Sequence, residues 1–252
     1  MIIGGLALLL LVVPLVGLLV RAPWTGLGRL LGSDELTSAL RVSLVSSLAA
    51  TTLCGLLGLP LAWLLARWVF PGRRLVRALA VLPMVMPPVV GGIALLTGFG
   101  RAGIVGRYLD HWFGITLPYT TAGVVLAETF VALPFLVVTA EAAFRSTDRR
   151  MEDAARTLGA GRWTVLRRIV LPATWPSLAA GLVLCWARAL GEFGATITFA
   201  GNFPGRTRTM PIAIYLAFES RPDAAIALSL VLLGVSVTVL VALRDRWLGA
   251  LR

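Results

Sequence analysis

The chain has 252 residues, of which 58% are hydrophobic and only 14% are charged. That charged fraction is far below the roughly 25% of a soluble domain, so the composition excludes a water-soluble globule. All 23 basic residues are arginine and the net charge is +11. The arginines separate apolar segments and form no basic surface with interleaved aromatic residues. They therefore indicate membrane orientation and headgroup contact, and we expect no nucleic-acid partner.

The apolar segments predict six membrane-spanning helices, because about 20 apolar residues in a helix cross a bilayer core. The first segment lacks the basic flank and the cleavage site of a signal peptide, so we expect it to stay in the protein. The fourth segment includes Glu128 and Glu141, and the fifth includes Arg188 and Glu192. The predicted fold is an all-α polytopic membrane protein, one transmembrane domain over 1–252, with spans at about 1–20, 42–66, 78–100, 119–144, 173–200 and 224–243.

Prolines interrupt several of these spans. Pro60 lies in the second span, Pro134 in the fourth, and a proline-rich segment, 82–88, opens the third. Each proline removes a backbone donor and kinks a helix. Such breaks persist in membranes where neighbouring helices or a water-filled path satisfy the freed groups. We therefore expect a bundle that contains a pathway.

The distribution of arginine predicts the orientation of the chain. The connections after the second and fourth spans and the C-terminal segment 244–252 hold more arginines than the connections after the first, third and fifth spans. Because arginine is enriched in cytoplasmic loops, both termini and the loop 145–170 are expected in the cytoplasm. The segment 101–118 is expected outside.

Several residue types argue against chemistry within this chain. Lysine is absent, so the chain cannot form a Walker A loop, whose lysine contacts the phosphates. Cys54 and Cys185 lie singly in apolar spans, which is typical of small buried side chains. The single histidine, His111, argues against a metal site built from several histidines. We expect no catalytic residue, cofactor or metal in this chain.

The loop 145–170 predicts a short amphipathic helix. Asp148 is a suitable N-cap and Gly159 a suitable C-cap. A second amphipathic stretch leads to Leu171 and Pro172. Periodicity alone leaves two functions open, a helix lying among lipid headgroups or a helix that docks on another protein. The apolar positions, spaced i, i+3, i+4 and i+7, are Met151, Ala154, Ala155 and Leu158.

This loop resembles the E-A-A loop of permease subunits of bacterial ABC importers, in which E-A-A, three residues and Gly are followed by nine residues and I-x-L-P. Gly159 is followed here by nine residues, 160–168, and then by Ile169. Asp153 stands in place of the glutamate, although Glu152 could also supply the charge. The resemblance implies a type I permease fold and a coupling helix seated in a separate ATPase, through Glu152, Asp153, Ala154, Ala155, Leu158, Gly159, Ala160, Ile169, Leu171 and Pro172.

A second resemblance narrows the substrate. Residues 190–202 and 204–215 are similar to the end of the fifth span and the following outer loop in molybdate importer permeases. Sulfate and thiosulfate permeases share the segment Gly191–Gly194, whereas the run 204–211 favours molybdate. The resemblance implies an importer of molybdate or tungstate in the inner membrane of a prokaryote, with a homodimer of this chain, two copies of an ATPase and an extracytoplasmic molybdate-binding protein.

Arg188 and Glu192 are four residues apart and can pair on one helical face. A charge exposed at mid-bilayer costs roughly 2.5 to 3.5 kcal/mol, so we expect both side chains to face the interior of the helix bundle. The pair would either fix helix packing or line a gate in the path. Arg206 and Arg208 are candidates for docking the binding protein, with headgroup anchoring as the alternative.

Two other functions stay open at this point. One is a sulfate-type permease, which in that family pairs with a second, different permease. The other is a proton-coupled carrier or membrane enzyme that uses Glu128, Glu141 or Glu192 as a proton relay. The relay would leave the spacing of the E-A-A loop unexplained.

Overall fold

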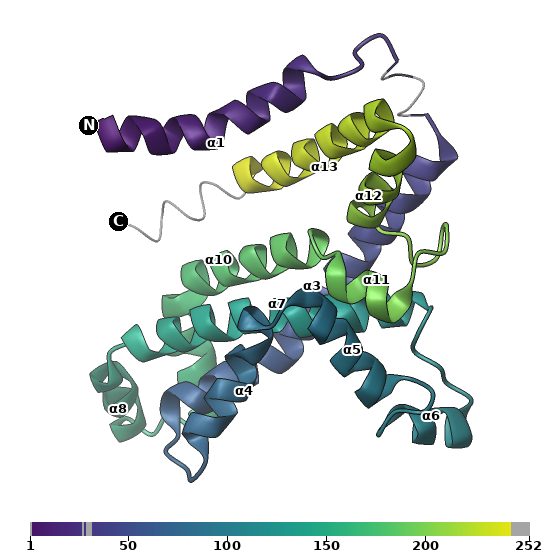
Figure 1. Ribbon diagram of the computed structural model, residues 1–252. Coiled ribbons are helices and arrows are strands. Elements are labelled where there is room, and N and C mark those ends of the chain that lie inside the picture. The colour runs from purple at the N-terminus through teal and green to yellow at the C-terminus, as the bar shows by residue number, and fades with distance from the viewer. Residues whose placement is uncertain (1, 27, 29–31, 243–252) are drawn as a thin grey trace.

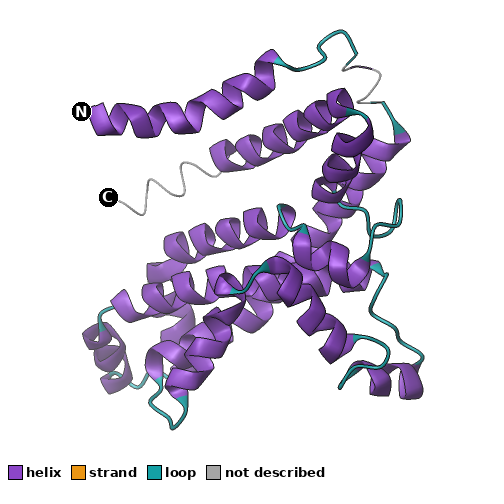
Figure 2. Ribbon diagram, in the orientation of Figure 1, coloured by secondary structure: helices purple, strands orange, loops and turns teal. Residues whose placement is uncertain are grey.

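The computed structural model describes residues 2–26, 28 and 32–242, and all of their regular secondary structure is helical (Figures 1 and 2). Five described helical segments are long and apolar enough to cross a membrane. The predicted end of the last span at Leu243 and the arginines Arg29, Arg244, Arg246 and Arg252 lie outside the described residues. The five segments are α1 (Ile2–Val20), α3 (Asp34–Arg67), α7 (Thr121–Ser146), the stretch Arg162–Leu190 that ends in α10 (Leu171–Leu190), and α13 (Pro222–Ala242).

The third predicted span is divided into two helices. α4 (Arg73–Val85) ends at Met86, which has an extended backbone, and α5 (Pro88–Phe99) begins one residue after Pro87. Two consecutive prolines lack N–H groups, and proline forces the residue before it out of the helical region. The segment 78–100 therefore contains a break between two helices, where the sequence analysis expected one kinked span.

The fifth predicted span is divided in the same way. α10 ends at Leu190, and α11 (Gly194–Ala200) begins after a short turn. α11 packs on α5, so the helices that follow the two breaks lie against each other. Their approach depends on missing side chains, because a β-carbon at Gly92 would lie 2.5 Å from the Thr198 β-carbon.

The centre of the bundle is formed by α3, α7 and α10, which pack on one another. Small residues line these contacts, as is common where membrane helices approach closely. A β-carbon at Gly181 would lie 3.1 Å from Thr139, and both cysteines are buried here as predicted. The shared core cluster consists of Ala50, Cys54, Ala132, Leu136, Cys185 and Ala189.

α1 and α13 lie beside each other away from this centre (Figure 1). None of the apolar window of α1 is buried within the chain. α12 (Met210–Ser220) packs on both α13 and α3 and connects this pair to the bundle. The apolar surface of α1 is thus available to lipid or to another protein.

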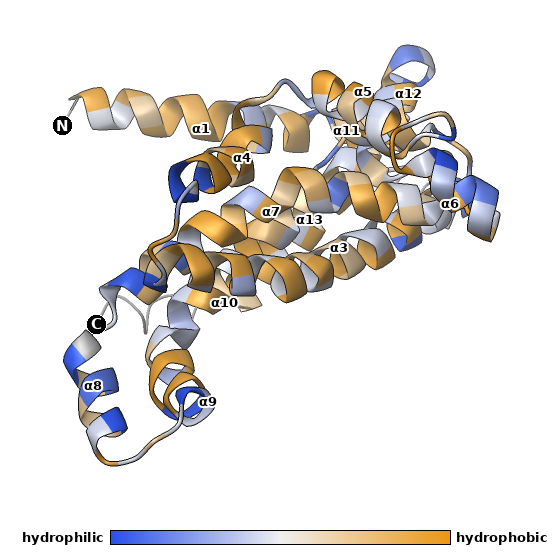
Figure 3. Ribbon diagram, turned by 90° about the horizontal axis from the view of Figure 1, so that it is seen from below, coloured by the Kyte–Doolittle hydropathy of each residue, from blue (hydrophilic) through white to orange (hydrophobic). Residues whose placement is uncertain are grey.

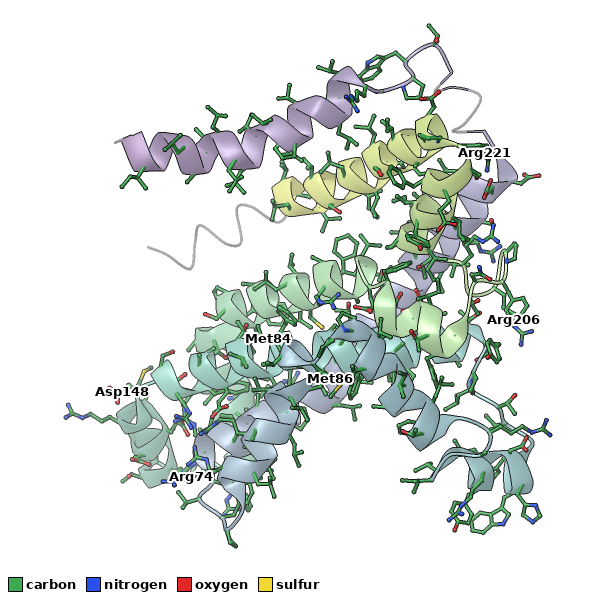
Figure 4. The ribbon with its side chains drawn as sticks, viewed as in Figure 1. Arg74, Met84, Met86, Asp148, Arg206 and Arg221 are labelled. Atoms are coloured by element: carbon green, nitrogen blue, oxygen red, sulfur yellow. The ribbon has the colours of Figure 1, made fainter. Side chains whose placement is uncertain are left out.

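Polar segments gather at two opposite ends of the apolar bundle (Figure 3). α8 (Arg149–Thr157), α9 (Arg162–Val165) and the start of α4 lie at one end, and α6 (Gly106–Phe113) lies at the other. Figure 4 likewise places Arg74 and Asp148 at one end, and Arg206 and Arg221 at the other. The predicted topology requires this separation of the loops; which end faces the cytoplasm stays a prediction.

Candidate functional site

The predicted helix in the loop 145–170 is present as α8. The Asp148 carboxylate accepts a hydrogen bond of 2.9 Å from the Arg150 backbone N–H, which makes Asp148 the N-cap. Leu158 ends the helix, and Gly159 follows with a φ of +87°. A positive φ disfavours residues with a β-carbon, so glycine at position 159 stops the helix and turns the chain.

The apolar side chains of α8 face either outward or toward the bundle. Met151 is 56% exposed, Leu158 is 89% exposed, and Ala154 is also exposed. Ala155 is half-buried and packs against the core cluster at this end of the bundle. We name Met151, Ala154 and Leu158 the outward stripe. It is an apolar surface that the rest of the described chain does not cover.

The two adjacent carboxylates of α8 have different surroundings. Glu152 is buried and forms an ion pair with Arg67, the last residue of α3; its second oxygen lies 3.7 Å from Arg156. The side chain of Asp153 is 70% exposed and lies 3.8 Å from Arg156. Asp153 is therefore the carboxylate that can meet another subunit, whereas Glu152 holds α8 to α3.

Sequence reasoning missed Arg67 as a partner of this loop. It lies 85 positions from Glu152, and nothing in the local pattern connects them. The Arg67 guanidinium also lies 5.3 Å from the ring centre of Trp63. A cleft of about 670 Å³ opens beside this ion pair, between the end of α3 and the loop; its lining includes Trp63, Arg67, Trp68, Glu152, Arg156, Arg162 and Trp163.

The I-x-L-P segment joins the loop to α10 through a π-helix, Leu166–Val170. The Leu171 N–H donates to the Leu166 carbonyl, five residues back. Pro172 is the second residue of α10 and has no N–H to donate, and the helix reaches it through this π-helical turn. Ala160 and Leu171 pack on the core cluster at this end and Ile169 is half-buried, so these residues seat the loop on the bundle and do not extend the outward stripe.

The expected pair in the fifth span is present. The Arg188 guanidinium lies 2.6 Å from Glu192, whose side chain is 1% exposed. The other Glu192 oxygen accepts a hydrogen bond of 2.8 Å from the Ala195 backbone N–H in the first turn of α11. Glu192 therefore fixes the break between α10 and α11, which matches the packing role; the gate role stays a prediction.

The other two carboxylates within the predicted spans also have partners on neighbouring helices. Ser46 donates a 2.8 Å hydrogen bond to Glu128 and so joins α3 to α7. Glu141 accepts from Arg77 of α4 at 3.1 and 3.2 Å and pairs with Arg145 at 2.8 Å. The spacing of Glu141 and Arg145 could have revealed their pair, whereas the contacts between helices leave no local signal.

The two arginines proposed for binding-protein docking have different surroundings in the structure. Arg208 donates to the Asn202 carbonyl at 3.2 Å and lies 3.4 Å from Glu35, at the start of α3. Arg221 also pairs with Glu35, at 2.8 Å. Arg206 is exposed and its side chain points away from the helices (Figure 4). Arg206 can meet a partner directly, and Arg208 anchors the loop that carries it.

Comparison with known proteins identifies relatives over most of the chain. The family described as "Binding-protein-dependent transport system inner membrane component" matches residues 58–249. The molybdenum transport system permease protein ModB of Mycobacterium tuberculosis is 48% identical over 233 residues, 92% of this chain and 88% of the relative. The sulfate transport system permease protein CysT of Escherichia coli is 36% identical over 236 residues, 92% of this chain and 85% of the relative.

Solved structures show the same fold. A bacterial ABC transporter that imports the acidic polysaccharide alginate matches with a TM-score of 0.75 at 21% identity, covering 97% of this chain and 92% of the transporter chain. The transporter in complex with an alginate pentasaccharide-bound periplasmic protein matches with a TM-score of 0.73 at 20% identity, covering 98% and 93%. The fold is that of type I ABC importer permeases, as the sequence predicts.

Proposed function

Because the chain belongs to the family of binding-protein-dependent transport system inner membrane components, we propose that it is the permease subunit of an ATP-driven importer of molybdate. The substrate assignment rests on a comparison of two sequence identities. Over 92% of this chain, identity is 48% with a molybdenum permease and 36% with a sulfate permease. Tungstate forms a dianion of the same tetrahedral shape, and we include it in the substrate class.

The outward stripe supports docking of a separate ATPase. Met151, Ala154 and Leu158 are exposed on a helix whose other side is held against the bundle. Apolar side chains at the centre of a docking surface, with charged residues beside them, are typical of a protein contact. Asp153 and Gly159 flank the stripe. We propose that α8 is the coupling helix and that two copies of the ATPase bind one transporter.

The surface of α1 supports a homodimer in the membrane. Its apolar window is entirely unburied within the chain, and it lies beside α13. Two copies of this chain would enclose a central path between them, and lipid would cover the remaining apolar surface. Both termini and α8 are placed in the cytoplasm in this proposal, and α6 and the loop that carries Arg206 outside.

Transport in this proposal needs no reacting group in the permease. A binding protein delivers the dianion to the outer end, and ATP binding and hydrolysis in the partner ATPase move α8 at the inner end. The helices that follow the breaks, α5 and α11, lie against each other between these ends. Selectivity resides in the binding protein, and the subunit is proposed to hold no cofactor.

Co-purification tests the ATPase contact. Ala154→Glu places a charge on the outward stripe and should abolish co-purification of the partner ATPase from membranes. The matched control is Ala102→Glu, the same change at an exposed alanine at the opposite end, which should leave the ATPase bound. Retention of the ATPase by Ala154→Glu would remove the outward stripe from the docking surface.

A sulfate permease is the second candidate, because CysT resembles most of the chain. A sulfate system of that type would pair this chain with a second, different permease. Mass measurement of the purified complex separates the two candidates: two identical copies support the proposal, and one copy with a different permease supports the sulfate alternative.

A further inference from the structure

α3 extends between the two ends of the bundle as one helix that contains Pro60 near its inner end. It has 34 residues, which corresponds to about 50 Å of helix at 1.5 Å per residue. Glu35 lies in its first turn and Arg67 is its last residue. Glu35 forms an ion pair with the outer loop, at the end that the proposed function assigns to the binding protein. Arg67 forms one with α8, which it assigns to the ATPase.

At the inner end, Arg67 pairs with Glu152 of α8. The side chains are 8% and 5% exposed, so water screens the pair little. The second oxygen of Glu152 faces Arg156 of the same helix. Glu152 therefore fixes α8 against α3 from the side opposite the outward stripe, and a shift of α8 acts on α3 through this pair.

At the outer end, Glu35 pairs with Arg208 in the loop between α11 and α12. The same carboxylate pairs with Arg221, which ends α12. Further along α3, the Ser43 hydroxyl accepts a hydrogen bond of 2.7 Å from the Met210 N–H. The outer loop and α12 are thus fixed to the start of α3 by three separate contacts.

We propose that α3 links the outer loop to the coupling helix, with Glu35 and the Arg67–Glu152 pair as positioning residues at its two ends. The proposal rests on the proposed function, because it assigns the binding protein to one end and the ATPase to the other. A helix whose two ends are fixed can transmit a displacement between them, because packed protein interiors are hard to compress. None of these residues needs to contact substrate.

The test uses the complete transporter, with its ATPase and molybdate-loaded binding protein, in lipid vesicles. The measured quantity is the stimulation of ATP hydrolysis by the binding protein, relative to hydrolysis without it. Glu152→Gln and Glu35→Gln each keep the size of the side chain and remove its charge. Each should lower stimulation by about tenfold, within the range of allosteric coupling. Asp34→Asn, next to Glu35 on the same turn, is the control and should keep full stimulation.

Combining the two variants tests the link itself. If α3 connects both ends, Glu35→Gln with Glu152→Gln should lose little more stimulation than the more severe single variant. Independent effects would multiply, because changes at distant, uncoupled sites add in free energy. A multiplied loss, or full stimulation in both single variants, would overturn the proposal.

Two further measurements keep the result interpretable. Thermal unfolding of each complex must stay close to that of the wild type, and Arg67→Lys, which keeps the charge, should retain more stimulation than Arg67→Gln. Equal loss in the lysine and glutamine variants would contradict a role for the ion pair. A wild-type complex that shows no stimulation by the binding protein contradicts the proposed function itself.

Discussion

Gly159 stops α8 because its backbone is left-handed. Its φ is +87°, and no atom would lie within 4 Å of an added β-carbon. The cost of a side chain there is therefore conformational and not steric, roughly 1–2 kcal/mol. The neighbouring Gly161 has equally open space but an ordinary φ of −66°, so it provides a matched comparison.

Gly159→Val should loosen the end of α8 and reduce transport-linked ATP hydrolysis, while the protein stays inserted in the membrane. Gly161→Val adds the same side chain without the backbone cost and should hydrolyse ATP as the wild type does. Hydrolysis by both variants in the reconstituted transporter provides the comparison. Equal activity would mean that the left-handed turn at Gly159 has no part in coupling.

Arg206 and Arg208 should respond differently to substitution. Arg206→Ala removes an exposed charge, so it should slow association with the binding protein, and less so at high salt because screening acts within about 10 Å at 0.1 M. Arg208→Ala breaks contacts to Glu35 and to the Asn202 carbonyl, so its effect should persist in high salt. Association rates measured across a salt series distinguish the two. The same salt dependence for both would contradict the division seen in the structure.

At the scale of elements, the contact between α5 and α11 depends on glycine. A β-carbon at Gly92 would lie 2.5 Å from the Thr198 β-carbon and 3.0 Å from the Ala195 carbonyl oxygen. Gly98, also in α5, has open space around it. One helix therefore offers the same substitution at a crowded and at an open position.

Gly92→Ala should push α5 and α11 apart and destabilise the protein by about 1–3 kcal/mol, the usual cost of overpacking. Gly98→Ala should be neutral or stabilising by roughly 0.5–1 kcal/mol, since alanine favours a helix over glycine. Thermal unfolding of the detergent-solubilised protein measures both. A melting temperature for Gly92→Ala at or above that of Gly98→Ala would show that the two helices are not in close contact.

The elements also show what sequence patterns can and cannot predict. α8 could be predicted with its cap and its end, because Asp148, the apolar spacing and Gly159 are all local signals. The pair Arg188–Glu192 follows from a spacing of four residues. Hydropathy predicted one span at 78–100, whereas the structure divides this segment into α4 and α5 at Pro87, because a running count of apolar residues is insensitive to backbone geometry.

Contacts between distant segments had no such signal. Nothing near Arg67 in the sequence marks it as the partner of Glu152, which lies in another loop. Glu35 pairs with both Arg208 and Arg221, which lie 173 and 186 positions away and leave no local signal. Single-sequence patterns describe neighbours along one helix, whereas these pairs depend on how helices pack together.

At the scale of the whole molecule, the structure groups the loops at two ends, and labelling can assign the ends to the two sides of the membrane. With Cys54 and Cys185 replaced, Arg107→Cys should react with an impermeant thiol reagent in intact cells, and Arg150→Cys should react only after permeabilisation. Both positions are exposed. Labelling of position 150 but not 107 in intact cells would invert the topology.

Uptake into vesicles tests most directly whether the assembled molecule is an ATP-driven molybdate importer. The chain is reconstituted with its partner ATPase and binding protein, and labelled molybdate or sulfate is supplied outside with ATP inside. We predict ATP-dependent uptake of molybdate, competition by tungstate, and little uptake of sulfate. Uptake of sulfate, with molybdate neither entering nor competing, would contradict the substrate, and molybdate uptake without ATP would contradict the importer itself.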